Sequence, residues 1–306
     1  MTSAPLANAA NAAPATTPSS GRFDWALLAL PGLIWGASFL FIAQGLEALA
    51  PDGVTFSRFV IGFLTLSLVP GARRPVLKSD RAGIAWLGVL WLAFPMSMFP
   101  YAEQSVSSAL TGMLNGSVPL MAAGVAALLA RKAPSRNIVM GLAVGFGGAV
   151  AMAVPGLDAG GNSARGVLMI MAALLSYGVA INLARPLQQR NGALPVVWRA
   201  LAVALILTAP RGVPALLAAR WSPRSLLAVL ALGFFGTAIA NVVMAVAAGR
   251  LGAARASATT FLIPVVALLL GVAVRGERVP VVAIGGSVLC LAGAWLVRRP
   301  TVPGHK

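Results

Sequence analysis

Charged side chains are scarce in this sequence. Aspartate, glutamate, lysine and arginine together make up 10% of the 306 residues, whereas hydrophobic residues make up 58%. A water-soluble domain of this length needs a much larger polar surface. Apolar stretches of about 20 residues, the length that crosses a bilayer as a helix, recur from Trp25 to Val297. Because these stretches lack the alternation of transmembrane barrel strands, the composition predicts an all-α integral membrane protein in contact with the lipid bilayer.

Residues that carry out most enzymatic chemistry are also few. His305 is the single histidine and Cys290 the single cysteine, which excludes an intramolecular disulfide and any site built from two histidines. The seven acidic residues are dispersed along the chain: Asp24, Glu47, Asp52, Asp80, Glu103, Asp158 and Glu277. A membrane enzyme usually needs a cluster of such groups at one interface. We therefore expect no enzymatic activity, no catalytic residues, no metal site and no cofactor.

Basic residues give the chain a net charge of +16. They are scattered among short connections, which is typical of the positive-inside bias of membrane proteins and argues against nucleic acid as a partner. With the N-terminus in the cytoplasm, the cytoplasmic connections of the first half hold seven basic residues, whereas its first outer connection holds none. The bias is weaker in the second half. The pattern predicts a multi-pass protein of the cell (inner) membrane with both termini cytoplasmic.

The apolar stretches divide into ten expected transmembrane helices. Their ranges are 25–46, 54–69, 82–102, 108–130, 137–154, 166–187, 194–209, 225–248, 257–274 and 279–297. Residues 1–23 are expected to form a disordered cytoplasmic leader and residues 299–306 a cytoplasmic tail. The ranges 24–155 and 164–298 are each expected to form a repeat of five helices.

The duplication is visible in the runs 108–152 and 257–297. Both contain a proline inside an apolar helix, an arginine near its end, a proline that starts the next segment, and two glycines seven positions apart. The matching residues are Pro119 and Pro264, Arg131 and Arg275, Pro134 and Pro280, Gly141 and Gly286, and Gly148 and Gly293. A duplicated unit of five helices enters the membrane in the opposite sense, as in transporters built from inverted repeats. Arg58 and Arg199 form a similar pair, and each is expected to snorkel to an interface.

Together these features resemble the drug/metabolite transporter superfamily, and specifically its EamA-type branch. The matching motifs are WGASF at 35–39, Pro51 followed by Arg58, the proline-centred fourth and ninth helices, RGERVP at 275–280, and GGSVLCLAGAWL at 285–296. The resemblance covers almost everything after residue 24. It implies ten helices in two inverted five-helix repeats, with a central cavity among helices one, three, four, six, eight and nine. The first repeat departs from the pattern, because Arg131 and Lys132 stand in place of Gly-Glu-Arg.

We expect this cavity to be nearly free of charge, since the segment ranges place every acidic residue at a helix end or in a connection. A phosphate-bearing substrate would need basic residues inside, and a quaternary cation would need a glutamate and an aromatic cage. Apolar walls with a few hydrogen-bonding groups fit a small amphipathic molecule instead. The residues expected to line the cavity are Trp35, Ser38, Phe94, Met113, Asn115, Tyr177, Asn182, Asn241, Thr259 and Thr260. The alternative is that these side chains only pack, since an asparagine in a membrane helix often bonds a neighbouring helix.

Two further features bear on mechanism. Pro119 and Pro264 are expected to break their helices, so that freed carbonyl groups could bind an ammonium group or allow gating; the alternative is a simple kink. Glu103, at the end of the third segment, is the candidate for proton coupling, because a relay usually needs a carboxylate at membrane depth. The alternative for Glu103 is a solvated position at the outer rim.

The sequence thus predicts a transporter that exports small metabolites by alternating access. Apolar or aromatic amino acids are the first choice of substrate, because the expected lining is apolar, aromatic and weakly polar. The alternative within the superfamily is a multidrug or organic-cation carrier, or a nucleotide-sugar carrier. The expected partners are a small-molecule substrate and the bilayer, and the expected state is a monomer or a weak homodimer.

Overall fold

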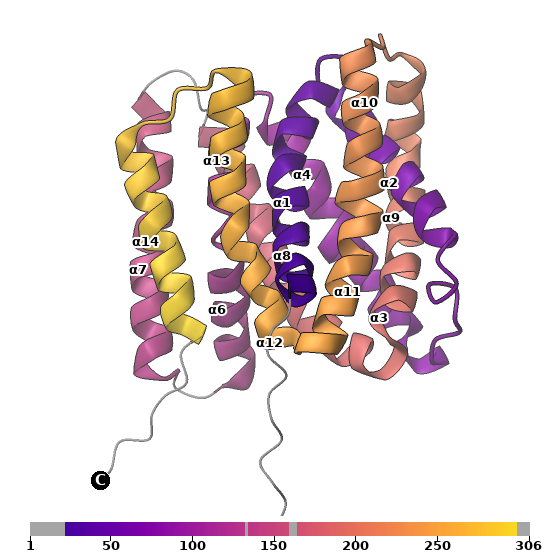
Figure 1. Cartoon of the computed structure of the whole chain (residues 1–306), viewed down its shortest axis with the longest axis horizontal. Helices are drawn as coiled ribbons and strands as arrows, with labels where there is room; N and C mark the ends of the chain where they lie inside the picture. The colour runs from indigo at the N-terminus through magenta and orange to yellow at the C-terminus, as the bar shows by residue number, and fades with distance from the viewer. Residues whose placement is uncertain (1–21, 132–133, 159–163, 299–306) are drawn as a thin grey trace, which may run out of the picture.

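The computed structural model describes residues 22–131, 134–158 and 164–298. This part of the chain is a bundle of helices joined by short connections, and it contains no β-strand (Figure 1). The elements are α1 (Arg22–Gly45), α2 (Pro51–Ser67), η1 (Lys78–Asp80), α3 (Arg81–Leu87), η2 (Gly88–Ala93), α4 (Phe94–Ala102), α5 (Ser108–Asn115), α6 (Val118–Ala130), α7 (Arg136–Asp158), α8 (Ala164–Asn191), α9 (Ala193–Leu217), α10 (Pro223–Ala231), η3 (Leu232–Ile239), α11 (Ala240–Leu251), α12 (Ala253–Ala256), η4 (Ser257–Phe261), α13 (Leu262–Arg275) and α14 (Val281–Arg298).

Eight helical stretches of the described chain are long and apolar enough to cross a membrane. They are Arg22–Gly45, Lys78–Ala102, Ser108–Ala130, Arg136–Val154, Ala164–Asn191, Ala193–Leu217, Pro223–Leu251 and Ser257–Arg275. The apolar helix Val281–Val297 and the 17-residue α2 are shorter. The predicted all-α membrane class is confirmed.

Each predicted segment coincides with a helical stretch, and the largest difference is at α9. The seventh segment, predicted to end at residue 209, continues to Leu217 through Pro210 and Pro214. Proline favours a helix end because it lacks an N–H donor, but apolar helices tolerate it where other groups satisfy the freed carbonyls. At the start of the chain, α1 begins at Arg22, inside the range predicted as a leader. Residues 1–21 and 299–306 lie outside the described residues.

Regular α-helix is interrupted at matching places in the two sequence repeats. The first run breaks between Asn115 and Val118, just before Pro119. Its counterpart has the 3₁₀ turn η4 just before Leu262, two residues ahead of Pro264. In addition, η2 and η3 are π-helical stretches inside the third and eighth predicted segments. Because π-helical turns often occur at functional sites, the helices around these two stretches are candidates for the functional site.

The duplicated glycines form a contact between α7 and α14, which lie side by side at one edge of the bundle (Figure 1). A methyl group added to Gly148 would lie 2.5 Å from the carbonyl oxygen of Gly286, and one added to Gly293 would lie 2.5 Å from the carbonyl oxygen of Gly141. Small residues permit such backbone contact between membrane helices. Since Gly141 meets Gly293 while Gly148 meets Gly286, the two helices run antiparallel.

Other contacts between the sequence halves also occur twice. Helix α1 packs on α13 at Gly36, where an added methyl group would lie 2.5 Å from the side chain of Val266, and α8 packs on α6 at Gly178, next to the backbone of Met121. Similarly, α2 packs on η3, and α9 packs on η2. The first helix of each repeat therefore contacts the fourth helix of the other, and the second contacts the third.

Large apolar side chains cover the outside of the bundle as well as its core. Leu168, Leu227, Leu269 and Val281 are each more than half exposed. An exposed apolar surface of this extent marks contact with lipid in a chain whose helices have membrane-spanning length.

Candidate functional site

Arg58 is the most deeply buried basic residue of the described helices, with 4% of its surface exposed. Its Nε donates a hydrogen bond to the hydroxyl oxygen of Thr237, at 3.3 Å. Thr237 lies in the π-helical stretch η3, which packs on α2. The prediction that Arg58 snorkels to an interface is wrong, because its side chain is enclosed between helices. The bundle therefore encloses a basic side chain at this position.

Three elements meet beside Arg58. The indole Nε1 of Trp35 on α1 donates to the carbonyl oxygen of Gly236 in η3, at 3.1 Å. A methyl group added to Gly236 would lie 2.8 Å from Ser38 Oγ and 3.9 Å from the Arg58 guanidinium. The absence of a side chain at Gly236 therefore lets α1 and α2 bring Ser38 and Arg58 close to the same backbone.

An aromatic group lies between α1, α4 and α8. The rings of Phe39 and Phe99 meet edge to face with centroids 5.6 Å apart, and those of Phe99 and Tyr177 are tilted with centroids 6.0 Å apart. Phe39 directly follows Ser38, which lies with Arg58 beside Gly236. The aromatic and charged groups thus belong to one region of the bundle.

Glu103 is half-buried at the end of α4, and its two carboxylate oxygens are buried without a hydrogen-bond partner among the described residues. Its backbone N–H donates to the carbonyl oxygen of Phe99, at 2.9 Å, so the carboxyl group follows the aromatic group by one turn. The carboxylate oxygens of Glu103 are thus shielded from solvent, although part of the residue is exposed. Burial, and then the negative charge of Glu277, raises the pKa of the Glu103 carboxyl well above its ordinary value, although Arg275 and Arg58 lower it.

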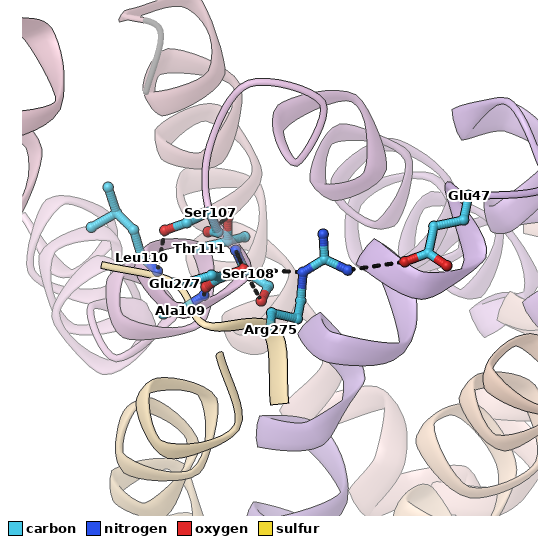
Figure 2. Close-up of polar contacts among 8 residues, drawn as sticks. All are labelled: Glu47, Ser107, Ser108, Ala109, Leu110, Thr111, Arg275 and Glu277. Atoms are coloured by element: carbon cyan, nitrogen blue, oxygen red, sulfur yellow. Dashed lines mark hydrogen bonds and ion pairs between the residues drawn. The ribbon is translucent and has the colours of Figure 1, made fainter. Parts of the chain in front are cut away.

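Near Glu103, the connection from α13 to α14 is tied to the first turn of α5. Figure 2 shows the Glu277 carboxylate accepting hydrogen bonds from the backbone N–H and hydroxyl of Ser108, at 3.0 and 2.7 Å, and from the N–H of Ala109, at 2.8 Å. Carboxylates stabilise helix N-termini because free N–H groups and the positive end of the helix dipole lie there. Arg275 lies 3.3 Å from both Glu277 and Glu47, so it links this cap to the end of α1.

The first repeat has a different residue at the related helix end. Arg131 ends α6 in a left-handed conformation with φ 48°, and Gly276 ends α13 with φ 65°. Arg131 is the one non-glycine residue with positive φ in the described chain. Lys132, which follows it, lies outside the described residues.

A model of the EamA-like transporter family matches residues 25–154 and 164–299. The two matched ranges cover most of the chain. This protein belongs to the EamA-like transporter family. It is 27% identical over 283 residues to a Streptantibioticus cattleyicolor protein described as "Probable terminal-alkyne amino-acid exporter", with 91% of this chain and 94% of that protein covered.

This EamA-like transporter is also 30% identical over 258 residues to the "Uncharacterized inner membrane transporter YedA" of Escherichia coli K12, covering 80% of each chain. A solved crystal structure superposes with a TM-score of 0.59 at 22% identity, covering 90% of this chain and 96% of that one. The likeness to this crystal structure shows that the two chains share a fold. The protein is therefore a multi-pass membrane transporter of the drug/metabolite type.

The other residues predicted to line the cavity lie in different surroundings. Asn182 donates to the carbonyl oxygens of Ala122 and Gly178, at 2.9 and 2.8 Å, and so joins α8 to α6. Asn241 donates to the carbonyl oxygen of Thr237, at 2.7 Å, one turn from the Arg58 contact. Both asparagines are half-buried.

The remaining residues of that group differ in burial. Met113 is fully buried in the apolar core, whereas Phe94 is 40% exposed. Asn115 is half-buried at the last position of α5. The hydroxyl of Thr259 donates to the carbonyl oxygen of Leu28 at 2.5 Å, joining η4 to α1, and that of Thr260 donates to Ser257 within its own turn.

Sequence reasoning missed Arg58 and Thr237 as members of the site. Arg58 carried a usable signal, because it is the single charged residue in an apolar segment otherwise rich in aromatic and β-branched residues. Intramembrane ionisable residues are functional by default. Thr237 carried no such signal, since its role depends on the π-helical stretch that turns its hydroxyl toward α2.

Proposed function

We propose that this transporter exports small metabolites, and apolar or aromatic amino acids in particular, across the cell (inner) membrane. The observation that carries the proposal is the alignment with a relative described as an amino-acid exporter over 91% of this chain. The aromatic group of Phe39, Phe99 and Tyr177 supports it, because apolar walls with a few polar groups suit amphipathic ligands.

We further propose ten membrane spans arranged as two inverted five-helix repeats, 24–155 and 164–298. The antiparallel contact of α7 with α14 and the twofold repetition of helix contacts support this arrangement. Transport then proceeds by alternating access, with one repeat moving against the other. The N- and C-termini are placed in the cytoplasm because basic residues concentrate in the connections of that side. A monomer or weak homodimer is sufficient for this mechanism.

The proposed substrate-binding residues are those expected from the sequence, with Arg58 and Thr237 added. Trp35, Ser38 and Asn241 gain support from their contacts beside this pair. Met113, buried in the core, has the weakest support of the set. We assign Pro119 and Pro264 to helix breaks that permit gating, because each follows an interruption of regular α-helix within a few residues.

Glu103 remains the proposed group for proton coupling. Its buried, unpartnered carboxylate supports this role. Replacement of Glu103 by Gln is expected to reduce the stimulation of export by a pH gradient. Export is measured in proteoliposomes with and without the pH gradient, for the wild type and for Glu103→Gln. If the ratio of the two fluxes is the same in both proteins, Glu103 has no part in the coupling mechanism.

The function is tested by counterflow in proteoliposomes with a panel of radiolabelled amino acids, organic cations and nucleotide sugars. Saturable counterflow of phenylalanine or leucine is expected. Counterflow of an organic cation or a nucleotide sugar, without that of any amino acid, would establish one of the alternative carriers of the superfamily. The buried guanidinium of Arg58 disfavours an organic cation, because like charges repel strongly where water is excluded.

A further inference from the structure

A groove runs along the outside of the bundle between α1 and the continuous helical stretch of α10 and η3. Its volume is about 540 Å³, within the range of about 300–1,000 Å³ that is typical of ligand sites. The lining is almost entirely apolar, and it includes side chains between 41% and 66% exposed, namely those of Leu227, Leu230, Phe234 and Phe235. The residues of the candidate site around Arg58 do not line this groove, so it is a separate feature of the described chain.

The directions of the two walls fix which residues share an end of the groove. A methyl group added to Gly45 would lie 3.1 Å from the side chain of Val229, whereas the indole of Trp35 bonds the carbonyl oxygen of Gly236. The wall formed by α1 therefore runs antiparallel to the wall formed by α10 and η3. The end of α1 and the start of α10 thus form one end of the groove (Figure 1), and η3 forms the other.

Two polar side chains line the groove at the first of these ends, Gln44 of α1 and Arg224 of the first turn of α10. Gln44 has only 9% of its surface exposed, and its side-chain amide makes no hydrogen bond with other described residues. Arg224 is exposed and takes no part in the ion pairs among the described residues. Because a buried amide without a partner is costly, the amide of Gln44 points to a ligand in the groove that supplies one.

The groove has the length of one leaflet of a bilayer. The residues from Arg224 to Phe235 rise by about 16 Å, at about 1.5 Å per residue. This length is about half of the hydrocarbon core, which is about 30 Å thick. Because a long basic side chain places its charge at the membrane interface, the groove extends from the headgroup region at Arg224 toward the middle of the bilayer.

We infer that the groove binds one anionic phospholipid of the surrounding bilayer. The guanidinium of Arg224 donates hydrogen bonds to the lipid phosphate, since its planar fork matches phosphate oxygens. The amide of Gln44 donates to an ester carbonyl of the lipid, and an acyl chain lies along Leu227 and Phe234. The inference goes beyond the proposed function, because it assigns a second ligand and a second site to the transporter.

Charge and shape together distinguish this groove from the apolar surface that any membrane helix offers to lipid. Exposed residues such as Leu168 and Leu269 provide apolar contact alone, whereas the groove adds a cation and an unpaired amide at one end. Basic pockets between membrane helices bind anionic headgroups. In the proposed orientation, Arg224 faces the outer side, where basic residues are usually scarce, and a bound headgroup accounts for its position there.

Binding is tested by native mass spectrometry of the purified full-length protein in detergent. Dioleoyl phosphatidylglycerol and dioleoyl phosphatidylcholine are compared at equal concentrations, because they share acyl chains and differ in net charge. The wild type is expected to bind one phosphatidylglycerol with about fivefold higher affinity, the effect of one basic residue on an anionic headgroup. Arg224→Gln should remove this preference, and Arg224→Lys should keep part of it.

Two further changes test the part of the groove that both lipids share. Gln44→Leu removes the amide that bonds the ester carbonyl, and Ala231→Phe fills the groove with a ring. Each should weaken the binding of the two lipids alike, by about threefold or more. The preference for phosphatidylglycerol should stay unchanged in both variants, because Arg224 is retained.

Matched controls are Arg220→Gln and Ala209→Phe. Arg220 is an exposed arginine of the connection before α10, and Ala209 is a half-buried alanine of α9; neither lines the groove. Both variants should bind lipid as the wild type does. Equal affinity of the wild type for the two lipids, an equal loss of preference with Arg220→Gln, or unchanged binding by Ala231→Phe would overturn the inference. Displacement of the bound lipid by phenylalanine would also overturn it, and would assign the groove to the transported substrate.

Discussion

The carboxylate of Glu277 accepts two hydrogen bonds from Ser108, one from its backbone N–H at 3.0 Å and one from its hydroxyl at 2.7 Å. The two residues belong to different sequence repeats. The short connection after α13 therefore holds the first turn of α5 (Figure 2). This contact joins the two halves through polar groups.

Replacing Glu277 by Gln removes the negative charge from the N-terminus of α5. We expect a loss of about 1 to 2 kcal/mol in stability, because the side chain caps the helix and interacts with its dipole. Thermal unfolding in detergent measures the change. Glu47→Gln is the control, since its pair with Arg275 is partly exposed at 3.3 Å and such pairs contribute about 1 kcal/mol or less. Equal effects of the two variants would contradict the assignment of a cap.

Neighbouring glycines of α14 provide a second test. Gly286→Ala should destabilise the protein by about 1 to 3 kcal/mol, because the new methyl group would lie 2.6 Å from the carbonyl oxygen of Gly148 and one helix must shift. Gly285→Ala should be neutral or stabilising by up to about 1 kcal/mol, since nothing lies within 4 Å of that position and alanine favours helix. The melting temperatures of the two variants should therefore change in opposite directions or by clearly different amounts.

Thr237 can be tested by an isosteric change. Thr237→Val removes the hydroxyl that accepts a hydrogen bond from Arg58 Nε and leaves a buried guanidinium less satisfied. A destabilisation of about 1 to 3 kcal/mol is expected, together with weaker substrate binding. Thr208→Val is matched, because the Thr208 hydroxyl bonds the carbonyl of Ala204 in its own helix. If Thr208→Val lowers the melting temperature and raises the half-saturation concentration of counterflow as strongly, the special role of Thr237 is wrong.

The raised pKa of Glu103 predicts a pH dependence of stability. Arg58 on α2 and the connection residues Arg275 and Glu277 are the charged groups that face it. A carboxyl group whose pKa is raised by folding contributes stability that is fully present below the unfolded value of about 4.3 and is lost as pH rises through the folded value. Relative to the wild type, Glu103→Gln should therefore become more stable as pH increases. Melting temperatures measured from about pH 4 to 9 test this, and parallel curves for the two proteins would exclude it.

The fold was largely predictable because its signals are local. Apolar runs, prolines and connection charges place the helices, and the shared glycine spacing identifies α7 and α14 as equivalent elements. The error at α9 arose from the same kind of reasoning, since Pro210 was treated as a terminator although the helix continues. Local patterns cannot show whether surrounding groups satisfy the carbonyl that a proline frees.

The site was less predictable because it depends on which way side chains point. Aromatic and polar residues on helices one, six and eight were expected near a cavity, and Trp35 and Asn241 lie close to Arg58 or its partner. The burial of Arg58, in contrast, follows from the packing of α2 on η3. Burial of the Glu103 carboxylate oxygens depends likewise on tertiary packing, which no spacing rule in the sequence expresses.

The glycine contact between α7 and α14 also limits how the protein can move. Helices that touch through backbone atoms have no flexible side chains between them to absorb sliding or tilting. If transport follows the proposed alternating access, we expect this edge of the bundle to act as the pivot. Larger displacements are then expected at the opposite edge, where α2, α9 and α10 lie (Figure 1).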